Sequence, residues 1–268
     1  VQGAQDLHDS KTMLEALFVA GLYNTVIYHS DIVEIVTRSS LMWFGGGLRK
    51  EREVVYPTLA YYVHKMYSTA YRLGAAYSVK IDITSPTFNV IRIHPDYRAD
   101  AYDVPYVDAA VLANEHSSLL AIMVVNYHTN KDMNLTIRLH DYVIKGPITV
   151  VSLAPKAIME INSWTEPNRV KPFENTIESV DENTITYTLP KHSVTMFIVR
   201  GRPSATTTTP ATMPTAPGTQ QTETKHTPTS TPTPSGIEWF TPSTLVTIIS
   251  IFVVGVILVC FLLKRIRS

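Results

Sequence analysis

Residues 1–73 combine two helical patterns of apolar side chains with one short strand-like run. Between residues 10 and 29 the apolar or small positions recur every three or four residues, which predicts a helix with Asp9 or Ser10 as its N-cap. Residues 32–36 resemble a strand, 43–47 (Trp-Phe-Gly-Gly-Gly) a loop, and 56–72 a second helix opened by Tyr56-Pro57. The predicted order is therefore helix, strand, loop, helix.

The apolar period changes to two after residue 74. Apolar and polar side chains alternate through residues 77–84, 135–139 and 185–189, and less regularly through 194–200. The continuous apolar run at 119–125 suits a strand that is buried on both faces. Roughly eight short strands separated by turn residues favour an antiparallel β-sandwich over residues 74–202.

Residues 203–236 have a different composition from everything before them. Of these 34 residues, 13 are Thr, 7 are Pro and 3 are Ser, and no Leu, Ile, Val or aromatic residue occurs. Such a segment buries too little apolar surface to offset the entropy of ordering the chain. We expect an extended, O-glycosylated stalk, with an unmodified flexible linker as the alternative.

The last apolar segment has the length and the flanks of a membrane helix. Leu245 to Leu263 is nineteen residues without a charge, or roughly 28 Å of helix, enough to cross a hydrocarbon core. Trp239 and Phe240 precede it, and the basic tail 264–268 follows. These flanks predict a single-pass cell-membrane protein that contacts the bilayer through Leu245 to Leu263, within an interfacial and transmembrane segment 237–263. Its bulk is expected to be extracellular and its short C-terminus cytoplasmic. Removal of the segment in favour of a lipid anchor is the alternative.

Charge and cysteine content exclude several functional classes. The chain has 23 basic and 23 acidic residues, three of the basic ones in the C-terminal tail, so no basic field for nucleic acid is expected. Cys260 is the single cysteine, which excludes an internal disulfide framework and any multi-cysteine metal site. The nine histidines show no metal-binding spacing. We expect neither a metal nor another cofactor.

The residues alone do not specify a reaction. Glycoside hydrolysis needs two carboxylates, but the glutamates of the helical part, which are Glu15, Glu34, Glu51 and Glu53, lie in polar or solvated contexts without an evident partner. Gly45-Gly46-Gly47 lacks the ending of a phosphate-binding loop. Asn134-Leu135-Thr136 is an N-glycosylation sequence, which agrees with an extracellular location.

Seven motifs, in consistent order, resemble the C-terminal part of family 51 α-L-arabinofuranosidases. They are EALFVAGLYN at 15–24, DIVEI at 31–35, YP at 56–57, DVPYVD at 103–108, VVNY at 124–127, NS followed by EPNRV and a proline within 162–172, and LPKHSV at 189–194. The resemblance implies that residues 1–73 are the C-terminal portion of a (β/α)8 barrel and that 74–202 form a jelly-roll sandwich. It also implies a retaining hydrolase that uses two glutamates to release terminal α-L-arabinofuranosyl units.

The resemblance places the catalytic glutamates on barrel strands upstream of this chain, so no catalytic residue is assigned here. The family's last barrel strand carries a sugar-contacting Gln in an A-Q-L-V-N run, and the matching run here is 39–43, with Ser40 for Gln and Trp43 for Asn. Ser40 is too short for the same contact. Trp43 could stack on a sugar ring, with packing inside a loop as the alternative. Ser40 and Trp43 are the substrate-binding candidates.

We therefore expect the C-terminal part of an extracellular, membrane-anchored glycosidase that acts on an arabinose-containing polysaccharide or oligosaccharide. A lone barrel segment would leave strand edges and apolar faces bare, so we expect the intact protein to extend upstream of Val1. This chain by itself is predicted to be inactive, and a homo-oligomer is possible by resemblance. The competing hypothesis is a non-catalytic carbohydrate-binding or surface display protein, with Trp43 and Trp164 facing glycans.

Overall fold

The computed structural model describes residues 11–37, 41–42, 46–90 and 101–204. Their elements, in chain order, are α2 (Met13–Tyr28), β1 (Leu48–Glu51), β2 (Val54–Pro57), α3 (Leu59–Arg72), β3 (Tyr77–Val79), β4 (Thr87–Val90), β5 (Ala101–Pro105), β6 (Val107–Ala113), β7 (Leu119–Asn126), β8 (Met133–Arg138), β9 (Tyr142–Ile144), β10 (Ile148–Leu153), β11 (Phe173–Ile177), β12 (Thr184–Leu189) and β13 (Ser193–Pro203). The two helices and the strands belong to one compact unit. The boundaries predicted between barrel portion, sandwich and stalk stay predictions.

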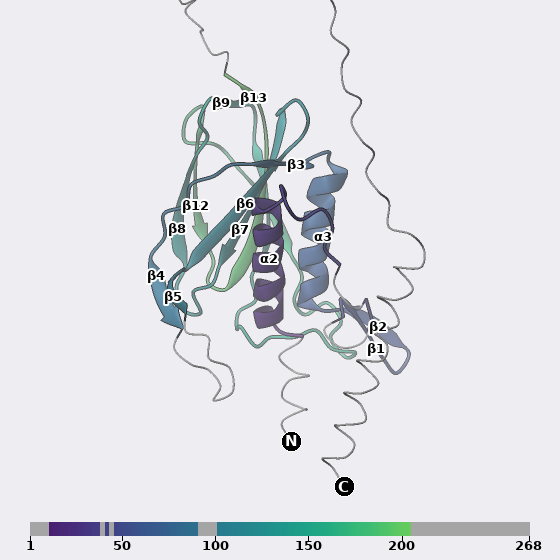
Figure 1. The fold of residues 1–268 in the computed structure, drawn as a ribbon. Coiled ribbons are helices and arrows are strands. Elements are labelled where there is room, and N and C mark those ends of the chain that lie inside the picture. Colours follow the sequence, from purple (N-terminus) through teal and green to yellow (C-terminus); the bar gives the residue numbers. More distant parts are fainter. Residues whose placement is uncertain (1–10, 38–40, 43–45, 91–100, 205–268) are drawn as a thin grey trace, which may run out of the picture. The chain divides into compact units, whose positions relative to one another are not determined.

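One large antiparallel sheet organises this unit. Its strand order is β11-β10-β13-β7-β6-β3, and β9 pairs with the far end of β13. Strands β8 and β12 form a separate antiparallel pair, and so do β4 and β5. The helices α2 and α3 lie next to each other in front of the large sheet, with β8 and β12 behind it (Figure 1). The result is a sandwich whose main sheet carries helices on its other face.

Strand β7 shows why the apolar run at 119–125 has no polar positions. Its odd-numbered residues, among them Met123 and Val125, belong to the core that the sheet shares with the helices. Its even-numbered residues, among them Ile122 and Val124, belong to the core between the large sheet and β8–β12. Successive side chains of a strand point to opposite faces, so a strand between two cores must be apolar throughout. All eight residues of β7 are buried, which confirms the prediction.

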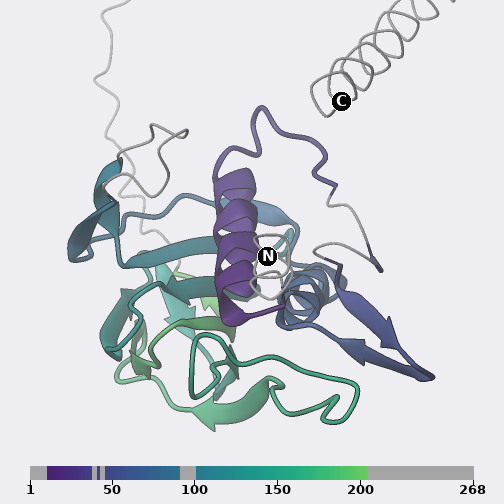
Figure 2. The same cartoon turned by 90° about the horizontal axis from the view of Figure 1, so that it is seen from below.

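The helices cover the sheet with one face each. From α2 the buried side chains include Met13, Leu17 and Ala20, and from α3 they include Val63 and Met66. Helix α3 is amphipathic, whereas α2 is apolar on both sides: Phe18 points outward and is 67% exposed. Figure 2 shows the two helices from below, with α2 crossing the strands at the sheet's surface.

The predicted strand at 32–36 is not formed. Ile32 and Ile35 are 76% and 81% exposed, and the described residues 31–37 follow α2 without regular structure. A strand exists only where a neighbour accepts and donates its backbone hydrogen bonds, and no described strand pairs with this segment. Its apolar side chains are therefore left facing solvent.

Three further boundaries differ from the prediction. The second helix starts at Leu59, because Tyr56 and Pro57 belong to β2 and Thr58 provides the N-cap, its side chain accepting from the Tyr61 N–H at 3.4 Å. The first helix starts at Met13 after Thr12, and Asp9 and Ser10 lie outside the described residues. The alternating run at 77–84 forms a strand only over β3, where β6 pairs with it.

The stalk at 203–236 lies outside the described residues from 205 onward, and so do the predicted membrane segment 237–263 and the tail 264–268. Strand β13 continues to Pro203, one residue into the predicted stalk. Within the described ranges, no helix has the length and apolar character needed to cross a bilayer.

Candidate functional site

The described residues nearest the substrate-binding candidates form a short bridge. Met42 pairs with Leu48 in a parallel arrangement, and the Leu48 N–H donates to the Leu41 carbonyl oxygen at 2.7 Å. Ser40 and Trp43 stand on either side of residues 41–42, but both lie outside the described residues, so their roles stay predictions. The structure thus fixes where this loop meets β1.

The hairpin β1–β2 continues from this loop and is held from inside. Arg49 lies opposite Tyr56, and the buried Tyr56 hydroxyl donates to Glu51 Oε2 at 3.2 Å. Burial raises the pKa of Tyr56, and the bond to Glu51 raises it further; burial lowers the pKa of Arg49. Glu51 therefore serves as a hydrogen-bond acceptor within the hairpin.

The other glutamates considered as acids lie in three separate places. Glu53 lies 4.0 Å from Lys50, and both side chains are exposed, so this ion pair contributes little. Glu34 is exposed in the segment 31–37, and Glu15 lies in the first turn of α2. In the part of the chain that the structure describes, no group of three or more His, Cys, Asp or Glu side chains is arranged to hold a metal ion.

The hairpin's tip and base are both fixed to the long loop between β10 and β11. At the tip, Arg52 adopts a left-handed backbone (φ 54°), and its guanidinium carbon lies 4.0 Å from the centroid of Trp164. At the base, Asn162 Nδ2 donates to the carbonyl oxygens of Pro57 at 3.0 Å and Val170 at 2.9 Å. Arg52 occupies one face of the half-buried Trp164, so that face is not open to a glycan.

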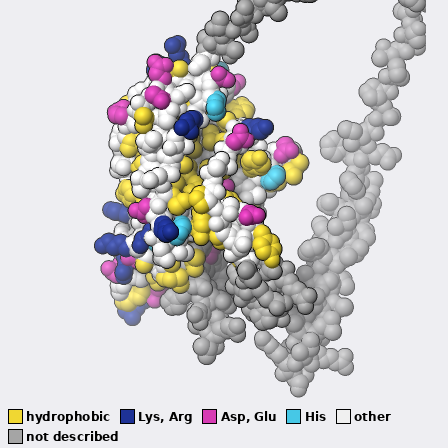
Figure 3. All heavy atoms as spheres, turned by 90° about the vertical axis from the view of Figure 1, so that its left-hand side faces the viewer, with side chains coloured by type: hydrophobic (Ala, Val, Ile, Leu, Met, Phe, Trp, Pro, Cys, Tyr) yellow, Lys and Arg dark blue, Asp and Glu magenta, His cyan; other side chains and the backbone are white. Residues whose placement is uncertain are grey.

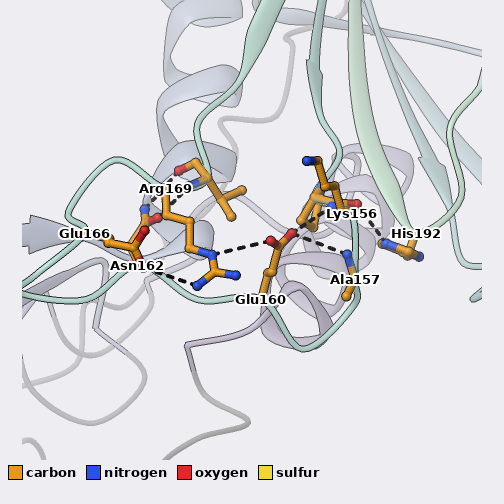
Figure 4. Close-up of polar contacts among 9 residues, drawn as sticks. Lys156, Ala157, Glu160, Asn162, Glu166, Arg169 and His192 are labelled. Atoms are coloured by element: carbon orange, nitrogen blue, oxygen red, sulfur yellow. Dashed lines mark hydrogen bonds and ion pairs between the residues drawn. The ribbon is translucent and has the colours of Figure 1, made fainter.

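Asn162 uses its whole amide in this connection. Its Oδ1 accepts from the Val170 N–H at 2.8 Å, and the side chain is 1% exposed. In Figure 4 the neighbouring loop residues form a second, more exposed set of contacts, in which Arg169 lies 3.4 Å from Glu160 and 3.2 Å from Glu166. Asn162 of the Asn-Ser motif is therefore a structural joint between the sandwich and the chain entering α3.

His192 makes a similar joint at the other end of this loop. Its ring nitrogens lie 2.9 Å from the Thr129 carbonyl oxygen and 3.0 Å from the Pro155 carbonyl oxygen, and the residue is 1% exposed. The ring thereby connects the turn after β7 with the start of the β10–β11 loop. Figure 4 shows His192 beside Lys156 at the start of this loop. Both joints use residues of sequence motifs, and both orient backbone.

A polar network is buried where α2 and α3 meet β6. The Tyr67 hydroxyl donates to Asn24 Oδ1 at 2.6 Å, and Asn24 Nδ2 donates to Asp108 Oδ2 at 2.9 Å. Burial raises the pKa of Asp108, against the hydrogen bonds from Asn24 and the Ala109 N–H, and burial raises the pKa of Tyr67 well above its ordinary value. Asn24 is 2% exposed, so its amide substitutes for water at the carboxylate.

Sequence reasoning placed Asn24 and Asp108 in motifs but gave them no role. A signal was available, because Asn24 is a polar residue four positions after Ala20 and seven after Leu17, on the buried stripe of the helix. A polar residue at such a position needs an internal partner. Its partner Asp108 lies 84 positions away, which no local pattern reveals.

Beside this network lies an open cleft of about 400 Å³ between the end of α2 and the chain after β3. Asn24, Tyr28 and His29 line it from the helix side, and Asp82 and Asp108 from the sandwich side. Figure 3, which faces the left-hand side of Figure 1, shows a band of hydrophobic side chains running down the middle of that view. The carboxylate of Asp108 is already bonded to Asn24, so the network braces the helix on the sheet.

Comparison with known proteins agrees with this architecture. The family model for the α-L-arabinofuranosidase C-terminal domain matches residues 2–193. The chain is 27% identical over 194 residues to the intracellular exo-alpha-(1->5)-L-arabinofuranosidase of Halalkalibacterium halodurans, covering 70% of this chain and 35% of that protein. It is 30% identical over 187 residues to the intracellular exo-alpha-(1->5)-L-arabinofuranosidase 1 of Bacillus subtilis, covering 67% and 34%.

Solved structures share the fold. The α-L-arabinofuranosidase of Thermotoga maritima, in complex with arabinose, superposes with a TM-score of 0.64 at 22% identity, covering 70% of this chain and 38% of that one. The family 51 enzyme of Thermotoga petrophila gives 0.65 at 23% identity, covering 73% and 40%. This chain spans about a third of the length of the curated relatives. Because the family match extends over most of its residues, the chain belongs to the family of α-L-arabinofuranosidase C-terminal domains.

Proposed function

We propose that this chain is the C-terminal part of a retaining glycosidase that hydrolyses terminal α-L-arabinofuranosyl units of polysaccharides or oligosaccharides. Its family membership and the activities for which its relatives are named support the reaction. In a retaining mechanism one glutamate acts as acid and base while a second, about 5–5.5 Å away, forms the glycosyl-enzyme intermediate. Both glutamates would lie on barrel strands upstream of this chain.

The observation that carries the proposal is the apolar surface around α2 and the segment 31–37. Phe18 is 67% exposed, and Ile32 and Ile35 are 76% and 81% exposed. A helix that is apolar on both sides is ordinarily covered on both sides. The earlier strands and helices of a barrel would supply this cover.

This chain's own contribution would be to position the loop after that strand. Active sites of such barrels lie at the C-terminal ends of the strands, which is where residues 38–47 would begin. The bridge from Met42 to Leu48 holds the start of the β1–β2 hairpin that follows this loop. The Asn162 bonds to Pro57 and Val170 hold the end of the same hairpin. Ser40 and Trp43 are the substrate-binding candidates of this loop, Trp43 through stacking on the sugar ring.

The test compares two proteins with aryl α-L-arabinofuranoside as substrate. One is this chain alone, and the other is the product of the coding sequence extended upstream. We expect no turnover by the chain alone and turnover by the extended protein, lost when either of its two strand-end glutamates is replaced by Gln. An extended protein without a barrel, or one that binds arabinoglycans without cleaving them, would refute the proposal and favour the carbohydrate-binding alternative.

We further propose that residues 245–263 anchor the protein in the cell membrane with the sandwich outside. The relatives named above are called intracellular, so this location sets the chain apart from them. Its support is the uncharged run with aromatic residues before it and Lys264, Arg265 and Arg267 after it. Protease added to intact cells should remove the sandwich from the wild type. A sandwich that is protected in intact cells and cleaved only after lysis contradicts the proposal.

A further inference from the structure

The outer surface of the β8–β12 pair carries a ladder of small polar side chains. In its register Asn134 lies opposite Thr188, Thr136 opposite Thr186, and Arg138 opposite Thr184. The alternate residues, such as Leu135 and Ile185, point into the core behind the large sheet. Figure 3 looks onto this side of the molecule, where much of the surface is neither charged nor hydrophobic.

Asn134 and Thr136 present the Asn-X-Thr sequence on the exposed face of β8. The two residues are two positions apart on one strand, so their side chains leave the same face, and both are exposed. Asn134 Oδ1 accepts a hydrogen bond from the Thr188 hydroxyl at 3.2 Å. This bond turns the other amide atom, Nδ2, away from Thr188, and Nδ2 is the atom that an N-linked glycan occupies.

The surface around Asn134 leaves room for the first sugars. An open hollow of about 370 Å³ lies over the pair, lined by Thr136, Thr186 and Thr188 together with Asn134, Leu135 and Tyr187. Hydroxyl groups at this spacing offer hydrogen-bond donors and acceptors to a sugar lying flat on the strands. Within the described residues β8 pairs only with β12, so a bulky glycan here would also hinder pairing of β8 with a strand of another molecule.

We propose that Asn134 is a site of N-linked glycosylation and that the glycan covers the β8–β12 surface of the folded domain. This inference rests on the extracellular location proposed above, because attachment requires translocation of the sandwich. The ligand class is a covalent oligosaccharide joined through Nδ2, formed by transfer from a lipid-linked sugar donor with the pyrophosphate lipid as leaving group and the amide proton released.

The test expresses the full chain behind a secretion leader in glycosylating cells and follows its gel mobility before and after peptide N-glycosidase. We expect the wild type to shift by one glycan. The shift should disappear in Asn134→Gln and in Thr136→Ala, and persist in Thr136→Ser, which keeps an acceptor sequence. The glycosylated wild type should also resist limited proteolysis as the folded domain does.

A control separates this inference from the proposed location. Glu182→Asn, made in the Asn134→Gln background, creates an acceptor sequence with Asn183 and Thr184 at an exposed turn. A glycan on this control but none on the wild type overturns the inference and leaves the extracellular location standing. No glycan on either protein also overturns the inference, whereas the location is decided by the protease experiment on intact cells. A glycan at Asn134 found only on protease-sensitive, misfolded protein also overturns the inference.

Discussion

Asn162→Ala should destabilise the domain far more than its single small side chain suggests. The substitution removes three hydrogen bonds, to the Pro57 and Val170 carbonyl oxygens and from the Val170 N–H. Each such bond contributes about 1 kcal/mol net, so the loss is about 3 kcal/mol, and more if the buried backbone groups stay unpaired. For a domain of this size about 1 kcal/mol lowers Tm by about 2–4 °C, which gives a decrease of about 6–12 °C.

Thermal unfolding of the full chain in detergent micelles, followed by tryptophan fluorescence, measures this decrease. Ser163→Ala is the matched control, because its hydroxyl contacts only Thr165 and the Glu166 N–H at the surface, and its Tm should fall by less than about 2 °C. Asn162→Asp keeps the acceptor but loses both donated bonds, so it should resemble Asn162→Ala. A Tm for Asn162→Ala within the range of Ser163→Ala would refute the reasoning.

Three other predictions concern the buried parts of the domain. Burial raises the folded-state pKa of Asp108 above its unfolded value. The contribution of this carboxyl group to stability is therefore complete below the unfolded pKa, about 4, and is lost as the pH rises through the folded pKa. Asp108→Asn should make the urea midpoint less dependent on pH across that range. Gly21→Ala should destabilise the domain, because the new Cβ overlaps the Tyr127 hydroxyl. Tyr127→Phe removes that hydroxyl, so it should reduce the cost of Gly21→Ala in a double-mutant cycle. Additive effects of the two substitutions would contradict the overlap. Phe197→Ala, at a fully buried position, should cost about 3–5 kcal/mol in urea unfolding; a cost under about 1 kcal/mol would mean that this core is not packed as described.

Local pattern predicted those elements whose residues carry their own signal. The apolar run of β7 and the alternation of β8 and β12 were confirmed. A strand buried between two cores is apolar at every position, whereas a strand with one solvent-exposed face alternates between apolar and polar residues. The helix at 56–72 was placed with the wrong start. Pro57 is compatible with a first helical turn, but pairing with Leu48 in β1 decides its structure.

Contacts between distant segments were beyond the reach of pattern. The residues around Asn162 do not predict that its amide binds Pro57, 105 positions earlier, and the residues around Asp108 do not predict its hydrogen bond with Asn24. The strand expected at 32–36 was wrong for the same reason, since its apolar residues can pair only with neighbours that no described segment provides. The substrate-binding candidates Ser40 and Trp43 came from family resemblance, and they remain predictions.

The large sheet contributes side chains to two hydrophobic cores, one on each of its faces, and this limits how the protein can be divided into smaller folded pieces. Removing α2 and α3 would strip Met123, Val125 and Met196 of their cover while the opposite side of the same strands stayed packed. A sandwich separated from the helices at residue 74 would thus expose a broad apolar sheet face to water and aggregate with other copies of itself. Anyone wishing to transplant this module should move the two helices with it.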